Sequence, residues 1–326
     1  MGVARVEMAA RESQEHKRSV VMLQTRYIHC RMRSLRSWLL IPLALLVVSC
    51  DRGDTVVVGA KSFTEGYLLG HMAVELLRSE GYEVEEQFGV ASAAMRRALE
   101  SGQIDLYYEY TGTAYSVYAG GKDVAVMSDS ARVLQAVRAF DLGEHQLQWL
   151  TPLPFNNTYT LLMKKERANG IATLGDLAAA INGGQALTIA VDGEFYERPD
   201  GMKALAERYA IRSPVIRKLD AGLAYQALSE GEVDVSMGYS TDGRIQALGL
   251  VELADNLHFF PAYNPAAVAR VGLLSRHPEI AAILGRINSR LTTATMRRLN
   301  AAVDLHHRDP RKVAREWLVE VGLIGG

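Results

Sequence analysis

A pattern of fourteen residues occurs twice in this chain of 326 residues, at a constant offset of 129 residues. Each copy holds a helix end, a glycine, a strand with a central aspartate and a final tyrosine. A glycine that ends a helix just before a strand is typical of α/β folds. We therefore predict two similar α/β lobes, each with a tyrosine beyond the carboxyl end of a strand, where such folds bind ligands. The matched pairs are Ala98 with Ala227, Gly102 with Gly231, Asp105 with Asp234, and Tyr110 with Tyr239.

The first lobe is predicted to open with a buried strand over residues 55–60, followed by a helix that ends at Gly81. Ser62 and Glu65 have the spacing of a capping box at the start of that helix. A chain of this length has room for two domains of ordinary size.

The second lobe is predicted to repeat this order, with a strand over residues 186–191, a loop over 192–199 and a helix capped by Asp200. The proline-rich stretch before residue 158 indicates a crossing between the lobes. We expect lobe 1 to comprise residues 51–156 with 263–326, and lobe 2 to comprise residues 157–262. The predicted fold class is α/β with two lobes, each a mixed sheet flanked by helices.

The first 50 residues are predicted to be a targeting segment and not part of the fold. A basic stretch over residues 31–37 precedes an apolar run over 38–48, which is too short to span a bilayer. Small residues then lead to Cys50, as in a bacterial lipobox, so we expect a lipoprotein signal peptide with Cys50 as the lipidated residue. A simple exported protein is the alternative. Met32 is the better initiator, and residues 1–31 need not be translated.

Composition excludes several classes of function. Eight of the 36 basic residues but only three of the 37 acidic ones lie in the first 50 residues, so the remaining chain is acidic and nucleic acid is not an expected partner. Cys30 and Cys50 are the only cysteines, so the body offers no disulfide, zinc site or thiol nucleophile. We find no catalytic constellation, phosphate loop or metal spacing, and expect no enzyme activity, metal or cofactor.

The candidate binding residues suit a ligand that carries one positive and one negative charge. Tyrosines at strand ends can surround a quaternary ammonium group, because the face of an aromatic ring attracts a cation. An arginine presents a planar fork that matches a carboxylate. An aromatic cage with such a fork predicts a zwitterionic ligand.

Four stretches are informative in combination: Gly59–Leu69, Glu109–Ala114, Arg198–Gly201 and Tyr239–Asp242. Together they resemble the glycine betaine, carnitine and choline-binding proteins of osmoprotectant ABC importers. The resemblance runs from about Val56 to Leu323 and implies a type II periplasmic-binding-protein fold with the ligand in the cleft between the lobes. It also implies a monomer in the periplasm or on the outer face of the cytoplasmic membrane, with an ABC permease and its ATPase subunit as partners.

By this resemblance, a tyrosine cage would hold the trimethylammonium group, and the matching residues are Tyr110, Tyr159, Tyr225 and Tyr239. The carboxylate of a betaine would be held by residues that match Lys61, Thr113 and Arg198. Asn157 matches a position that can contribute a backbone carbonyl near the cation.

Other ligands and functions remain open from the sequence. Choline or carnitine could replace glycine betaine, although choline has no carboxylate for Arg198 and Lys61 to face. An enzyme on the same fold would need a catalytic constellation. A ligand sensor for signalling would need a membrane span or a further module in the same chain.

Overall fold

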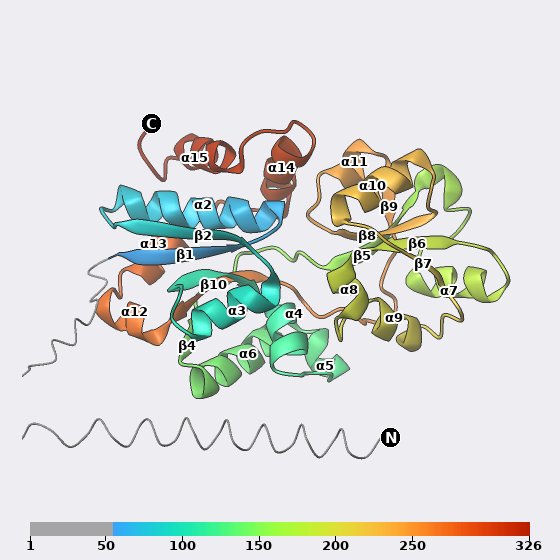
Figure 1. Ribbon diagram of the computed structural model, residues 1–326, viewed down its shortest axis with the longest axis horizontal. Helices are drawn as coiled ribbons and strands as arrows, with labels where there is room; N and C mark the ends of the chain where they lie inside the picture. The colour runs from blue at the N-terminus through green and yellow to red at the C-terminus, as the bar shows by residue number, and fades with distance from the viewer. Residues whose placement is uncertain (1–54) are drawn as a thin grey trace, which may run out of the picture. The chain divides into compact units, whose positions relative to one another are not determined.

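The computed structural model describes residues 55–326, which form two five-stranded mixed sheets with helices packed around them (Figure 1). The first 54 residues, and with them the predicted signal peptide and Cys50, lie outside the described residues. No helix in the described part is long and apolar enough to cross a membrane.

The first sheet has the strand order β2-β1-β3-β10-β4. Strands β2 and β3 pair with β1 in parallel, whereas β10 runs antiparallel to both β3 and β4. The bounds are β1 Val56–Lys61, β2 Val84–Val90, β3 Leu106–Tyr110, β4 Leu147–Trp149 and β10 Pro265–Arg270.

The second sheet has the corresponding order β7-β6-β8-β5-β9, again with two parallel pairs and two antiparallel ones. Between the sheets the chain passes from β4 to β5 and back from β9 to β10. The bounds are β5 Tyr159–Lys164, β6 Thr188–Val191, β7 Val215–Lys218, β8 Val235–Tyr239 and β9 Leu250–Glu252.

The helices cover both faces of each sheet. Helices α2, α14 and α15 pack together on one face of the first sheet, as Figure 1 shows. The helices are α2 Thr64–Ser79, α3 Ser92–Glu100, α4 Thr111–Thr113, the π-helical turn Ala114–Tyr118, α5 Val124–Met127, α6 Ser130–Glu144, the 3-10 turn Lys165–Arg167, α7 Leu174–Asn182, α8 Gly193–Glu197, α9 Met202–Arg208, α10 Ala221–Glu230, α11 Arg244–Ala247, α12 Val271–Arg276, α13 Ile280–Gly285, α14 Thr293–Asp304 and α15 Pro310–Glu320.

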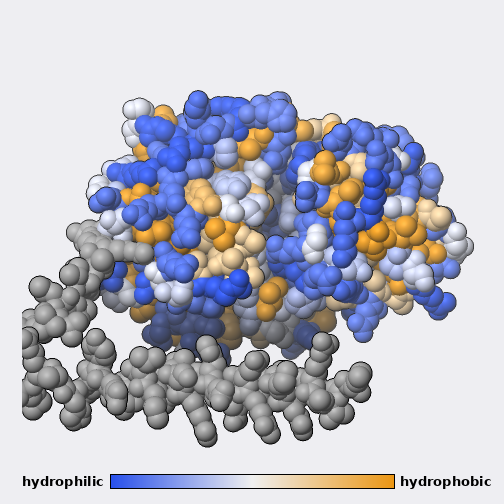
Figure 2. All heavy atoms as spheres, in the orientation of Figure 1, coloured by the Kyte–Doolittle hydropathy of each residue, from blue (hydrophilic) through white to orange (hydrophobic). Residues whose placement is uncertain are grey.

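Alternation along each strand gives every sheet two apolar cores. On β1, Val56 and Val58 face the core under α2, whereas Val57 faces the core on the other side of the sheet. Hydrophilic residues cover most of the surface seen in Figure 2, and apolar residues emerge there as separate small areas.

The sequence repeat is a structural repeat. Gly102 and Gly231 both end a helix with a positive φ, of 76° and 80°. Asp105 then accepts a hydrogen bond of 3.0 Å from the Val57 N–H, and Asp234 accepts one of 3.0 Å from Thr188. Each copy therefore locks its strand to the neighbouring parallel strand in the same way, and carries its tyrosine to the strand end.

Three local predictions were wrong. The capping box does not form, because Phe63 occupies the N-cap of α2 and the Glu65 carboxylate is bound elsewhere. Residues 193–197 form the short helix α8 and not a loop, since Asp192 caps it by accepting from the Phe195 N–H at 2.6 Å. Helix α9 begins after Gly201, and the Asp200 carboxylate pairs with Arg198 instead of capping.

Candidate ligand-binding site

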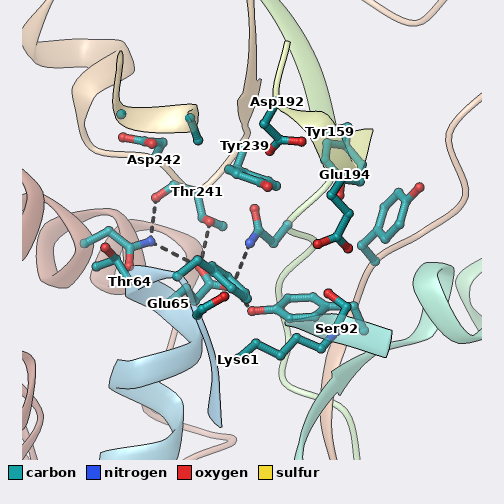
Figure 3. Close-up of a pocket in the computed structure, with 18 of the residues that line it drawn as sticks. Lys61, Thr64, Glu65, Ser92, Tyr159, Asp192, Glu194, Tyr239, Thr241 and Asp242 are labelled. Atoms are coloured by element: carbon teal, nitrogen blue, oxygen red, sulfur yellow. Dashed lines mark hydrogen bonds between the residues drawn. The ribbon is translucent and has the colours of Figure 1, made fainter. Parts of the chain in front are cut away.

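A cavity of about 680 Å³ lies where the carboxyl ends of β1, β3, β6 and β8 meet the segments that connect the two sheets. Residues from both sheets line it, and Figure 3 shows Tyr159 and Tyr239 with Glu65 and Lys61 around the same space. Seven of the eight residues expected in the site are among the lining residues: Lys61, Tyr110, Thr113, Asn157, Tyr159, Arg198 and Tyr239.

Five aromatic rings form a continuous wall of this cavity. The ring of Tyr239 lies 5.2 Å from that of Tyr159 and 6.1 Å from that of Phe63, centroid to centroid. Phe63 in turn lies 5.9 Å from Tyr110, and Tyr263 meets Tyr159 edge to face at 5.5 Å. Sequence reasoning did not assign Phe63 or Tyr263 to the site. The position of Phe63, just beyond the carboxyl end of β1, was a usable signal.

Tyr225 is not among the residues that line the cavity. It is buried in α10, and its hydroxyl accepts a hydrogen bond of 3.3 Å from the Tyr239 N–H. The Arg244 guanidinium lies over the ring of Tyr225, 4.1 Å from the ring centroid. Its expected place in the cage stays a prediction, whereas its contacts here support the backbone of Tyr239.

The side chains expected to hold a carboxylate already have acidic partners. Lys61 forms a buried salt bridge with Glu109. Arg198 donates from Nε and Nη2 to Asp200, at 2.8 and 2.7 Å, and from Nη2 to the Thr113 hydroxyl at 3.3 Å. An ammonium has three N–H donors and a guanidinium five, so both groups retain donors for a ligand while their partners fix their orientation.

Acidic side chains outnumber basic ones around the cavity. The basic lining residues are Lys61, Arg198 and Arg244. Figure 3 shows Asp192 and Glu194 on the side of Tyr159. Burial raises the pKa of Asp192, against the opposing effect of its hydrogen bond from Phe195. An excess of acidic over basic side chains favours a positively charged ligand. The acidic lining residues are Glu65, Asp192, Glu194, Asp220, Asp242 and Asp304.

Glu65 is the most buried of these acids and was not predicted to belong to the site. Its carboxylate accepts hydrogen bonds from four side chains. Burial raises its pKa, and the four hydrogen bonds oppose that shift in part. The donors are Tyr110 at 2.8 Å, Asn157 at 3.0 Å, Thr241 at 2.6 Å and Asn300 at 3.2 Å.

We find no candidate metal site in the described residues. No group of three or more histidine, cysteine or acidic side chains there could hold a metal ion. The site combines an aromatic wall, several acidic side chains and three basic side chains. Each basic side chain is paired with an acid: Lys61 with Glu109, Arg198 with Asp200 and Arg244 with Asp242. Two mixed sheets with such a cavity between them define a solute receptor of the periplasmic-binding class.

Comparison with known proteins identifies the family. The model of the family described as the substrate binding domain of ABC-type glycine betaine transport systems, OpuAC, matches residues 54–320, and the chain belongs to this family. The predicted family and fold class are thus confirmed. The protein is the substrate-binding component of an ABC importer that acts outside the cytoplasm, and its family is one of receptors and not of enzymes.

Individual relatives are similar to this chain along nearly their whole length. A glycine-betaine-binding protein of Pseudomonas aeruginosa is 37% identical over 302 residues, which cover 90% of this chain and 96% of that protein. The carnitine transport binding protein OpuCC of Listeria monocytogenes is 31% identical and covers 87% of this chain and 95% of its own. The structure of apo YehZ from Escherichia coli is similar with a TM-score of 0.64 at 31% identity, over 83% of this chain and 100% of that one.

Proposed function

We propose that the cavity binds a quaternary-ammonium zwitterion such as glycine betaine, for delivery to the permease of an ABC importer. The observation that carries the proposal is the joining of an aromatic, acid-rich wall to a cluster of paired cations in one cavity. Relatives whose names specify glycine betaine or carnitine support the same class of ligand.

The aromatic wall would receive the trimethylammonium group. Methylated nitrogen holds water weakly, so its transfer to a dry site costs little, and each desolvated ring face contributes roughly 0.5–2 kcal/mol. Of the four predicted rings, Tyr110, Tyr159 and Tyr239 line the cavity. Phe63 lies between Tyr110 and Tyr239, and Tyr263 extends the wall beyond Tyr159. The surrounding acids add a long-range attraction for the positive end.

Lys61, Thr113 and Arg198 would receive the carboxylate. Thr113 follows β3 in the first sheet and Arg198 follows α8 beside the second, and their contact at 3.3 Å brings donors from both sheets together. Glu109 and Asp200 already accept from Lys61 and Arg198. The affinity for a ligand carboxylate would therefore depend on the N–H groups of Lys61 and Arg198 that these two acids do not use. Carnitine also has a carboxylate, whereas choline would leave this cluster without a ligand group.

Delivery requires a state that the permease can distinguish. A ligand that contacts residues from both sheets binds best when the sheets close on it, and so shifts the population toward that state. We infer that the two lobes that close are residues 51–156 with 263–326 and residues 157–262. We also infer that the receptor is a monomer and that a lipid on Cys50 anchors it to the membrane.

Calorimetric titration of the purified protein with glycine betaine, carnitine and choline tests the proposal. We expect micromolar binding, about −8 kcal/mol, for a ligand with a carboxylate, and weaker binding of choline. Arg198→Lys, which removes the planar fork, should weaken betaine binding and leave choline binding nearly unchanged. Lys203→Met, which removes an exposed cation paired with Glu197, serves as the control and should change neither. No heat with any of the three ligands would contradict the proposal.

A further inference from the structure

Glu65 joins four separate parts of the molecule. It lies in the first turn of α2 and its side chain is almost fully buried at the cavity wall. Its Oε1 accepts from Tyr110 at the end of β3 and from Asn157 in the connection between the sheets. Its Oε2 accepts from Thr241, which follows β8, and from Asn300 on α14. Figure 3 shows hydrogen bonds that converge on Glu65 from Thr241 and its neighbours.

The two asparagines have their orientation fixed by this carboxylate. Both amide nitrogens, of Asn157 and Asn300, point toward Glu65 and donate to its carboxyl oxygens. Asn300 also donates to the Thr241 carbonyl oxygen at 3.0 Å. The two amide oxygens are then buried without a hydrogen-bond partner among the described residues. Separation of the sheets would hydrate these oxygens, so they oppose the closed arrangement while the bonds to Glu65 favour it.

Helix α14, which carries Asn300, also contacts the segment that follows β8. Arg297 on α14 donates to the Ser240 carbonyl oxygen at 2.8 Å, and Gly243 packs against Ala301 of α14. Tyr239 lies two residues before Thr241, and Tyr110 donates directly to Glu65. One carboxylate therefore links the strand ends that carry two rings of the aromatic wall, one from each sheet.

We propose that Glu65 is a positioning residue that holds the ends of β3 and β8 at the separation needed for the ligand and thereby favours closure of the two sheets. This inference rests on the proposed function for its effect on affinity, but not for its effect on the separation of the sheets. Its four donors are all neutral side chains, so Glu65 is the one acidic group within this set of contacts.

Measurement of a distance across the two sheets tests this directly. Spin labels at Leu142→Cys on α6 and Val215→Cys on β7, both exposed, report the separation in a chain whose Cys30 and Cys50 are changed to serine. Glu65→Gln keeps the shape of the side chain but removes the charge. Glu80→Gln removes a charge beyond the other end of α2, where Glu80 pairs with Arg286, and is the matched control.

We expect Glu65→Gln to shift the ligand-free distances to larger values and to weaken glycine betaine binding at least about tenfold, or 1.4 kcal/mol, with no loss of thermal stability. Glu80→Gln should match the unsubstituted chain in both measurements. A merely structural role would lower the melting temperature and leave the distances of the folded molecules unchanged, which would overturn the inference.

A second variant keeps the test decisive if Glu65→Gln fails to fold. Thr241→Val removes one donor to Glu65 and should shift the distances in the same direction by a smaller amount. In the double variant the two effects should not add, because both act on one contact; additive effects would contradict the coupling. If the unsubstituted chain binds no quaternary ammonium compound, the proposed function fails, and the ligand-free distances still decide the role of Glu65.

Discussion

At the scale of single residues, Tyr239 contributes to the cavity through its ring, and its position is fixed through its backbone. The Tyr239 N–H donates to the Tyr225 hydroxyl at 3.3 Å, and the ring lies against Tyr159. No hydrogen bond from the Tyr239 hydroxyl is found within residues 55–326. The ring lines the cavity, and an aromatic face is the part of a tyrosine that attracts a cation.

Substitution of Tyr239 separates the ring from its hydroxyl. Tyr239→Ala should weaken glycine betaine binding about tenfold or more, whereas Tyr239→Phe should weaken it less than about threefold, because cation–π attraction needs only the ring. Calorimetric titration measures both. Equal losses for the two variants would show that the ring face is not what binds the ligand.

The buried Glu65 should also affect how stability depends on pH. Its pKa in the folded state is raised above the usual value near 4.5, mainly by burial. Between the unfolded-state pKa near 4.5 and the higher folded-state pKa, the folded state binds more protons than the unfolded state. This group's contribution to stability is therefore lost as the pH rises through that window. The charged groups nearby are Lys61, which Glu109 pairs, and Asp242 and Asp304, which Arg244 contacts.

Glu65→Gln should therefore lose stability relative to the unsubstituted chain as the pH falls from neutral toward 4.5, because only the unsubstituted chain gains from protonation of this group. Urea unfolding of both proteins across this range measures the difference, and the other titrating groups cancel in the comparison. Parallel stability curves would mean that Glu65 has the same pKa in the folded and unfolded states.

At the scale of elements, α14 reaches from the first sheet to the segment after β8. The contact is close: a Cβ atom on Gly243 would lie 2.4 Å from the Cβ of Ala301. The backbone of Gly243 has an ordinary negative φ of −67°, so only this packing requires a glycine.

Gly243→Ala should thus push the segment away from α14, with a loss of roughly 1–3 kcal/mol in folding free energy from overpacking, and should weaken ligand binding through Thr241. Gly285→Ala on α13 meets no atom within 4 Å and is the control. Thermal unfolding and titration of the two variants provide the comparison. Unchanged stability and affinity in Gly243→Ala would show that α14 does not hold this segment.

The repeat made much of this architecture predictable from sequence. The offset of 129 residues placed Tyr110 and Tyr239 at equivalent strand ends, because the glycine and the aspartate of each copy have local and specific structural roles. Strand β10 was missed, since its sequence PAAVAR is short and alanine-rich, although it lies near the centre of the first sheet. The bonds to Glu65 could not be foreseen, because their donors come from positions up to 235 residues away.

At the scale of the whole molecule, the two sheets are joined both by covalent connections and by polar contacts around the cavity. Asn157 donates from its backbone to the Tyr263 carbonyl oxygen at 3.0 Å, so the two connecting segments bind each other. Arg198 to Thr113, Thr241 to Glu65, and Arg297 to Ser240 bridge the sheets elsewhere. The stacked rings of Phe63 and Tyr239 add an apolar contact between the sheets, and a ligand that touches both sheets can supplement all of these contacts.

We expect the cavity to recognise the positive charge of a quaternary ammonium group and not merely its shape. The most direct test is a titration that compares glycine betaine with 3,3-dimethylbutanoate, in which carbon replaces the nitrogen and the carboxylate is kept. Since the ring faces and the surrounding acids both act on charge, we predict that the carbon analogue binds at least about tenfold more weakly. Equal affinity for the two compounds would contradict this account.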